Sequence, residues 1–266
     1  MRSLGIDISK WQGKFVPQGN IDFVIIKVSE GMAVDPKFLD NLNAVMDVPY
    51  RGAYHYFRTA WDPIAQAEYF WDFAQHLFDF YAVDYEDYNN TLNAKGEKNL
   101  WKFYEKLSSL TDKPIYLYTT EYILRDTLVA YNKRWLDVPF WVARYNAGLD
   151  PQTAFPLFTG AIDNWGIWQY SSTGSGEEYG VDSNNIDLDV WNGLIQVEGE
   201  GEIDMKKWYA SKLNWSGVII IAIAVLQGLQ EYLAAQDFSP EAIATFVMGI
   251  LVIVFRTFFT DTGIEP

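Results

Sequence analysis

The stretch YAVDYED, residues 81–87, alternates apolar side chains with carboxylates. Successive side chains of a β-strand point to opposite faces, so Asp84 and Glu86 are predicted to share one face of a short buried strand. Two carboxyl groups at a strand end, among many aromatic residues, suit the hydrolysis of a glycosidic bond, which needs one protonated acid and one charged carboxylate. An acidic turn that faces solvent is equally consistent with this stretch taken alone.

Segments typical of strands and helices alternate on both sides of this stretch. Strands are predicted at residues 4–9, 23–28, 50–57, 81–86, 114–118, 139–144, 166–170 and 185–190, and helices at 36–46, 64–78, 96–109 and 121–129. Such alternation favours a parallel sheet. We therefore predict an α/β fold in which residues 1–193 form a TIM-like (β/α) barrel of about eight strands with some helices missing. Barrels of this kind carry their sites at the C-terminal ends of the strands.

The composition excludes several classes of function. A net charge of -15 argues against binding to nucleic acid, which requires a basic surface. The chain has no cysteine and only 2 histidines, so neither a disulfide framework nor a metal site is predicted, and no cofactor is expected. Aromatic residues make up 17% of the chain, with 11 tryptophans, which suits stacking on sugar rings. Residues 1–5 lack the apolar core of a signal peptide.

Carboxylates stand at the ends of several separate predicted strands: Asp7, the Asp84 and Glu86 pair, and Asp187. With these carboxylates in place, the chain resembles the glycoside hydrolase family 25 muramidases, also called Chalaropsis-type lysozymes. The resemblance rests on motifs in the order of the family: GIDISKWQG (5–13), FVIIKVSEG (23–31), GAYHYFR (52–58), VDYED (83–87), YLYTT (116–120), FWVARY (140–145), WQYSSTG (168–174) and IDLDVW (186–191). These motifs cover residues 1–193.

The resemblance implies cleavage of the β-1,4 bond between N-acetylmuramic acid and N-acetylglucosamine in peptidoglycan. It implies that Glu86 is the general acid, Asp84 its partner carboxylate, and Asp7 and Asp187 the aspartates of the first and last strands. A general acid needs a raised pKa, which burial and neighbouring negative charge would give. The anomeric carbon is attacked either by a carboxylate or by the N-acetyl group of the substrate with an aspartate orienting it, and the sequence leaves both open.

Aromatic residues around these acids are predicted to stack on sugar faces, although each is equally consistent with ordinary packing inside the barrel. They are Tyr54, Tyr56, Tyr118, Trp141, Tyr145 and Trp168. His55 alternates with two of these tyrosines, so we expect it on the opposite face as a hydrogen-bonded structural residue. We expect Arg144 to be a structural partner for a carboxylate. Asp182 and Asp189 are predicted to face solvent or to lie in turns.

The composition changes after the predicted barrel. Residues 194–207 read as an acidic linker with a basic flank, and residues 208–266 as a membrane hairpin with helices at about 215–235 and 240–260. Uncharged runs of 11 and 14 residues, with tryptophan, tyrosine and lysine before the first, favour the membrane over two soluble amphipathic helices. The polar stripe of Gln227, Gln230 and Glu231 indicates self-association. The positive-inside rule places the lysine flank in the cytoplasm.

The tail also resembles small membrane proteins encoded in phage lysis regions, on a short lysine–tryptophan entry and its hydropathy. The leading hypothesis is therefore a peptidoglycan hydrolase tethered to the cytoplasmic membrane of a bacterial host, in phage or prophage lysis. Peptidoglycan and, through residues 208–266, the lipid bilayer are the predicted partners. The alternatives are a catalytically silent glycan-binding barrel and a holin-like membrane protein that carries the barrel as a passenger.

Overall fold

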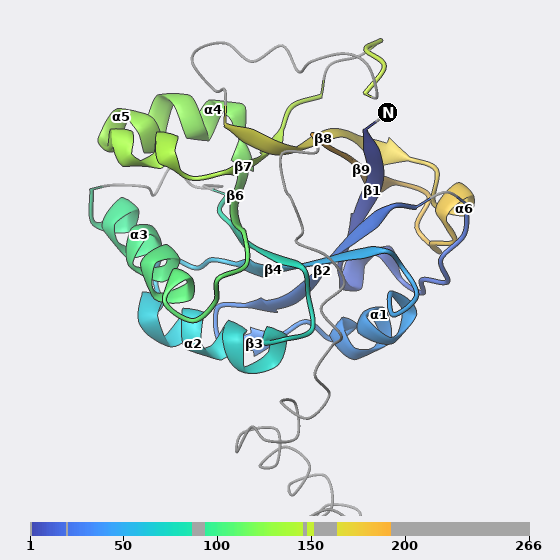
Figure 1. Ribbon diagram of the computed structural model, residues 1–266, viewed down its shortest axis with the longest axis horizontal. Coiled ribbons are helices and arrows are strands. Elements are labelled where there is room, and N and C mark those ends of the chain that lie inside the picture. The colour runs from blue at the N-terminus through green and yellow to red at the C-terminus, as the bar shows by residue number, and fades with distance from the viewer. Residues whose placement is uncertain (1, 20, 87–93, 146–147, 152–163, 193–266) are drawn as a thin grey trace, which may run out of the picture. The chain divides into compact units, whose positions relative to one another are not determined.

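The computed structural model describes residues 2–19, 21–86, 94–145, 148–151 and 164–192, and the strands among them form a closed barrel (Figure 1). The sheet has nine strands in the order β1-β9-β8-β7-β6-β5-β4-β2-β3, and a further pairing of β1 with β2 closes the ring, so that only β3 lies outside it. The strands are β1 (Ser3–Ile8), β2 (Phe23–Glu30), β3 (Ala33–Val34), β4 (Tyr50–Tyr56), β5 (Phe80–Asp84), β6 (Ile115–Thr120), β7 (Phe140–Ala143), β8 (Trp165–Gly174) and β9 (Ile186–Trp191). The predicted barrel of about eight strands is confirmed.

The strand directions depart from a regular TIM barrel at one position. Neighbouring strands from β1 and β2 round to β8 pair in parallel, as the alternation of strands and helices predicts. In contrast, β9 is antiparallel to both of its neighbours, β1 and β8. Only the short helix α6 (Gly176–Tyr179) separates β8 from β9, which is too little chain for a parallel crossover.

Helices cover the outside of the ring (Figure 1). They are α1 (Phe38–Ala44), α2 (Pro63–Ala74), α3 (Ala94–Ser108), and the consecutive turns α4 (Glu121–Ile123), η2 (Leu124–Leu128) and α5 (Val129–Tyr131). Between β1 and β2 the described chain has only a 3-10 turn, η1 (Lys10–Gln12), so a full helix is missing there as predicted. Asp62 caps α2 by accepting a hydrogen bond from the Ala65 amide, which helps to explain why this helix begins at Pro63.

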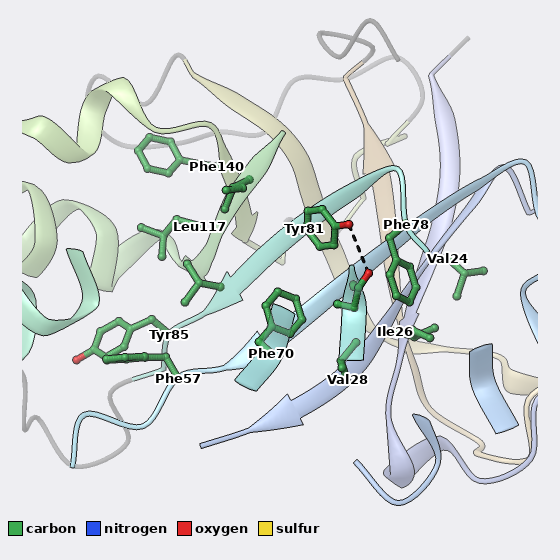
Figure 2. Close-up of a cluster of buried hydrophobic side chains, with 14 of the residues drawn as sticks. Val24, Ile26, Val28, Phe57, Phe70, Phe78, Tyr81, Tyr85, Leu117 and Phe140 are labelled. Atoms are coloured by element: carbon green, nitrogen blue, oxygen red, sulfur yellow. Dashed lines mark hydrogen bonds between the residues drawn. The ribbon is translucent and has the colours of Figure 1, made fainter. Parts of the chain in front are cut away.

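Strand alternation divides the buried side chains into two cores. In β5, Tyr81 and Val83 belong to the core between the strands and the helices, whereas Phe80 and Ala82 belong to the core inside the barrel. Figure 2 shows the outer core, where the Tyr81 hydroxyl donates a hydrogen bond to the carbonyl of Ala74 at 3.4 Å. This alternation directs the next inward position, Asp84, into the barrel at the C-terminal end of β5.

The predicted linker (194–207) and membrane hairpin (208–266) lie outside the described residues. Within the part of the chain that is described, no helix has the length and apolar composition needed to cross a membrane.

Candidate active site

The Asp84 and Glu86 pair stands where β5 ends. Asp84 is the last residue of the strand and is only 4% exposed, while Glu86, two residues later, is half-buried. Tyr85 between them is 1% exposed and packs into the outer core. The predicted alternation is thus present. The Tyr85 side chain points to the outer core, and the carboxyl groups of Asp84 and Glu86 point the other way.

Asp7 and Asp187 come from the first and last strands of the barrel and lie near the Asp84 and Glu86 pair. They are paired in register across β1 and β9, so two strands that lie far apart in the sequence but next to each other in the barrel hold them side by side. The charge of Glu86 acts on Asp84 and on Asp187, and both Asp7 and Asp84 act on the phenol of Tyr118. The structure therefore brings together the predicted acids Asp7, Asp84, Glu86 and Asp187.

Gln169, which is not among the predicted site residues, connects this cluster through hydrogen bonds. Its Nε2 donates to Oδ2 of Asp7 at 2.7 Å. Its Oε1 accepts from the hydroxyls of Tyr118, at 3.0 Å, and Tyr145, at 2.9 Å. Because an amide can donate at one end and accept at the other, Gln169 fixes the orientation of one acid and two phenols at once.

The three aspartates of this cluster, Asp7, Asp84 and Asp187, are held in surroundings that disfavour their charged forms. Burial, followed by the charges of Asp187 and Asp189, raises the pKa of Asp7 well above its ordinary value. Burial and then Glu86 raise the pKa of Asp84 well above its ordinary value, and Lys27 opposes this. Burial and Glu86 raise the pKa of Asp187 to about 6. Carboxyl groups with raised pKa values keep their protons to higher pH than free carboxyl groups do, which is typical of sites that transfer protons.

Replacing Asp187 by asparagine is expected to change how stability depends on pH. The folded-state pKa of about 6 exceeds the ordinary 3.8, so the wild-type protein loses stability as pH rises from about 4 through 6. The Asp187→Asn variant lacks this loss, and its free energy of unfolding relative to wild type should rise by about 1–3 kcal/mol between pH 3.5 and 7. Urea unfolding at both pH values measures it. The exposed Asp47→Asn should show no such change, and an unchanged difference for Asp187→Asn would contradict the expectation.

Three of the predicted sugar-stacking residues line the inside of the barrel. Tyr54, Tyr118 and Trp141 belong to the inner core, and the ring of Trp141 lies 6.0 Å from Tyr54 and 4.4 Å from Tyr118 between centroids. All three are at least nine-tenths buried, so in this structure they form the wall of the site and offer little face to a ligand. Of the predicted stacking residues, Tyr145 is the one with a large exposed area, at 54%.

Tyr56 and Trp168 have different surroundings. Two cations lie over the Tyr56 ring, with Lys27 Nζ at 4.8 Å and the Arg58 guanidinium at 4.7 Å from its centroid. Both cations also form ion pairs with Glu30. Trp168 is fully buried in the outer core and donates its Nε1 hydrogen to the carbonyl of Arg144 at 2.6 Å. The structure therefore places Trp168 on the helix side of the sheet, away from the acids.

The structural roles predicted for His55 and Arg144 are confirmed. His55 is fully buried on the outer face, with Nδ1 2.9 Å from Ser29 Oγ and Nε2 3.3 Å from Gln66 Oε1. Burial lowers the pKa of His55 to about 3, so it is neutral at the pH of any cell. Arg144 forms an ion pair with the buried carboxylate of Glu121 at 2.8 Å.

The expectation for Asp182 is also met, whereas that for Asp189 is wrong. Asp182 is exposed and accepts a hydrogen bond from the Lys14 amide. Asp189 is 0% exposed, and its Oδ1 accepts a hydrogen bond from Trp141 Nε1 at 2.7 Å. The reason is strand alternation, because Asp189 lies two residues after Asp187 in β9 and must share its face.

Comparison with known proteins points to one family. The sequence model of the glycosyl hydrolases family 25 matches residues 6–179, more than half of the chain. No curated protein sequence matches the chain. Among solved structures, the bacterial lysozyme from Streptomyces coelicolor superposes with a TM-score of 0.61 at 26% identity, covering 73% of this chain and 93% of that one.

Two further structures share the fold at lower identity. A muramidase from Trichobolus zukalii has a TM-score of 0.57 at 23% identity, over 72% of this chain and 94% of that one. The catalytic domain of an endolysin from a bacteriophage of Listeria monocytogenes has a TM-score of 0.54 at 22% identity, over 73% and 94%. Taken with the barrel and its acidic cluster, the match over residues 6–179 shows that the chain belongs to the glycosyl hydrolases family 25 and is a glycoside hydrolase of the lysozyme type.

Proposed function

We propose that the chain is an N-acetylmuramidase that hydrolyses the β-1,4 bond between N-acetylmuramic acid and N-acetylglucosamine in bacterial peptidoglycan. The observation that carries this proposal is the convergence of Asp84 and Glu86, at the end of β5, with Asp7 and Asp187 from β1 and β9. The family supplies the reaction class, glycoside hydrolysis, and the solved structures that share the fold include a lysozyme and a muramidase.

Glu86 is the proton donor in this proposal. It is half-buried where the described strand ends, so it is accessible to a glycosidic oxygen, whereas Asp84 is almost completely buried. Cleavage breaks the bond between the anomeric carbon and the glycosidic oxygen, and the proton of Glu86 passes to that oxygen. As this bond breaks, Asp84 stabilises the positive charge that develops at the anomeric carbon, either by attack or by orienting the N-acetyl group of the substrate. A water molecule then adds to the anomeric carbon and gives a proton back to Glu86, which completes the hydrolysis.

Digestion of purified peptidoglycan tests the reaction. The full-length protein should lower the turbidity of a cell-wall suspension, and borohydride reduction of the fragments followed by mass spectrometry should find muramitol at the new reducing ends. Reduced N-acetylglucosamine at those ends would show a glucosaminidase instead. Unchanged turbidity with retained binding to the walls would favour the silent glycan-binding barrel.

We further propose that residues 208–266 tether the enzyme to the cytoplasmic membrane of a bacterial host, where it acts in phage or prophage lysis. Support for this comes from the sequence alone: two long apolar segments, aromatic residues before the first, and a basic flank. The polar stripe at Gln227, Gln230 and Glu231 suits contact between copies of the hairpin.

Flotation with lipid vesicles tests the tether. The full-length chain should float with vesicles of bacterial lipid composition and should resist extraction by high salt, whereas a chain ending at residue 193 should stay in the aqueous fraction. Equal behaviour of both chains would refute the tether. Release of an encapsulated dye during the same experiment would favour the holin-like alternative for the tail.

A further inference from the structure

Asp189 lies inside the barrel, below the acids at its mouth. In β9 it pairs with Gly5 of β1 and with Gln169 of β8, while Asp187, two residues earlier, pairs with Asp7. Its side chain is 0% exposed, so it cannot touch a substrate directly. Any effect of Asp189 on the reaction must therefore pass through the groups that it contacts.

One group donates a hydrogen bond to Asp189, and a second carboxyl group lies beside it. Trp141 Nε1 donates to Oδ1 at 2.7 Å. Oδ2 is buried and receives no hydrogen bond from any N–H or hydroxyl among the described residues. The carboxyl group of Asp7 lies diagonally across from Asp189 on the inward face of β1 and β9, because Asp7 pairs with Asp187 and Asp189 pairs with Gly5, and the two carboxyl groups act on each other. Two carboxylate oxygens repel each other unless a proton lies between them, so this contact requires one.

The surroundings make loss of this proton unfavourable. The titratable groups that act on Asp189 or sense its charge are Asp7 on β1, Asp187 on β9, Tyr145 after β7 and Tyr170 on β8, and each is neutral or negative. Burial is the largest cause that raises the pKa of Asp7, and the charges of Asp187 and Asp189 add to it. Two carboxyl groups that interact this strongly titrate as one unit and retain one proton over a wide pH range.

We propose that Asp189 is a positioning residue that shares one proton with Asp7, and that this proton fixes the Asp7 carboxyl group beside Asp84 and Asp187. Asp7 is then held from two sides, by the amide of Gln169 and by Asp189. The pair carries one negative charge instead of two. A second charge would raise the pKa of the neighbouring Asp187 further and so move the pH range in which the site works.

Infrared difference spectroscopy on the full-length protein detects this proton without any substrate. In wild-type-minus-variant difference spectra at pH 7, both Asp7→Asn and Asp189→Asn should lose one C=O band of a protonated carboxyl group, whereas the bands of any other protonated carboxyl group should cancel. Asparagine at 189 can still accept from Trp141 and can donate to Asp7, so the fold should be retained while the need for a shared proton is removed. The exposed Asp182→Asn is the matched control and should keep the band.

Activity gives the second measurement, and for this part the inference rests on the proposed muramidase function. The Asp189→Asn variant should retain the wild-type melting temperature, while at least one limb of the pH profile of kcat/KM should move by about one unit or more. A wild-type profile in this variant, or a band that survives the substitution, would overturn the proposal. If Asp189→Asn fails to fold, the comparison of wild type with Asp7→Asn still decides, because an unchanged band would exclude a proton on the pair.

The two proposals fail in different ways. A wild-type protein that shows the band but leaves peptidoglycan intact would refute the muramidase and leave the shared proton in place. A protein that cleaves peptidoglycan but shows no difference between wild type, Asp7→Asn and Asp189→Asn in the infrared spectrum would refute the shared proton alone.

Discussion

Glu86→Gln is expected to lower kcat on peptidoglycan by about 10²–10⁴-fold, with a much smaller change in KM. Glutamine keeps the size and one hydrogen-bonding oxygen of glutamate but cannot release a proton to the leaving oxygen. The loss should appear in kcat because protonation matters most in the transition state. Initial rates of turbidity loss over a range of substrate concentrations separate kcat from KM.

The folding of this variant should be close to that of wild type, because Glu86 is only half-buried and lies beyond the last residue of β5. Its thermal unfolding midpoint provides the check. Glu105→Gln, an exposed glutamate on α3, is the matched control and should keep full activity. A fully active Glu86→Gln protein would remove Glu86 from its proposed role, and the acid would then have to be sought elsewhere in the cluster.

Local alternation made much of the candidate site predictable. Tyr81 and Val83 are apolar and buried on one face of β5, which directs Asp84 to the other face, and the sequence shows this without any tertiary information. The same reasoning placed His55 opposite Tyr54, and the structure confirms it. The register between β1 and β9, which sets Asp7 beside Asp187, depends on the closure of the barrel and cannot be predicted from local alternation.

The error at Asp189 shows where this reasoning was not carried far enough. Asp187 and Asp189 are two residues apart in β9, so placing the first inside the barrel required placing the second there as well. Aspartates are rarely buried, so the burial of Asp189 is unusual for its residue type. The sequence does not show that the indole of Trp141, 48 residues earlier, donates a hydrogen bond to one carboxylate oxygen of Asp189.

Trp168 and Gln169 illustrate a different limit. Both lie in the strand motif WQY, and only one of the two neighbours can face inward. A tryptophan suggests sugar stacking, but here it is the glutamine that faces the acids and the tryptophan that fills the outer core. No charged residue within the strand indicated which face pointed to the site, because the decisive contact is with Asp7, 162 residues away.

The clustering of buried acids lowers the stability of the fold. Asp7, Asp84 and Asp189 are each buried to more than nine-tenths and have raised pKa values, with burial as the first cause in every case. A stabilising arrangement would pair each with a cation, as Glu97 is paired with Arg134 at 2.6 Å near α3. Acids kept buried in this way indicate that the site is built for proton transfer at the expense of stability.

Asp84→Asn is therefore expected to separate activity from stability. The folded-state pKa of Asp84 is raised by burial and by Glu86, so ionisation of this group opposes folding as pH rises above its unfolded-state pKa. Asparagine cannot ionise, and the variant should be at least as stable as wild type at pH 7, while any gain should disappear at acid pH. Its kcat on peptidoglycan should nevertheless fall by about 10²–10⁴-fold, because an amide stabilises positive charge at the anomeric carbon poorly. Melting temperatures at pH 4 and 7, measured beside kcat, give both quantities.

Asp35→Asn is the matched control for this prediction. Asp35 is equally buried but accepts hydrogen bonds from the amides of Lys10 and Lys37, so Asp35→Asn should lose stability and keep most of its activity. If Asp84→Asn lost stability and activity in proportion, the result would mean that Asp84 only supports the barrel. The charged form of Asp84 would then stabilise the fold, whereas the proposed role requires a charged form that opposes folding.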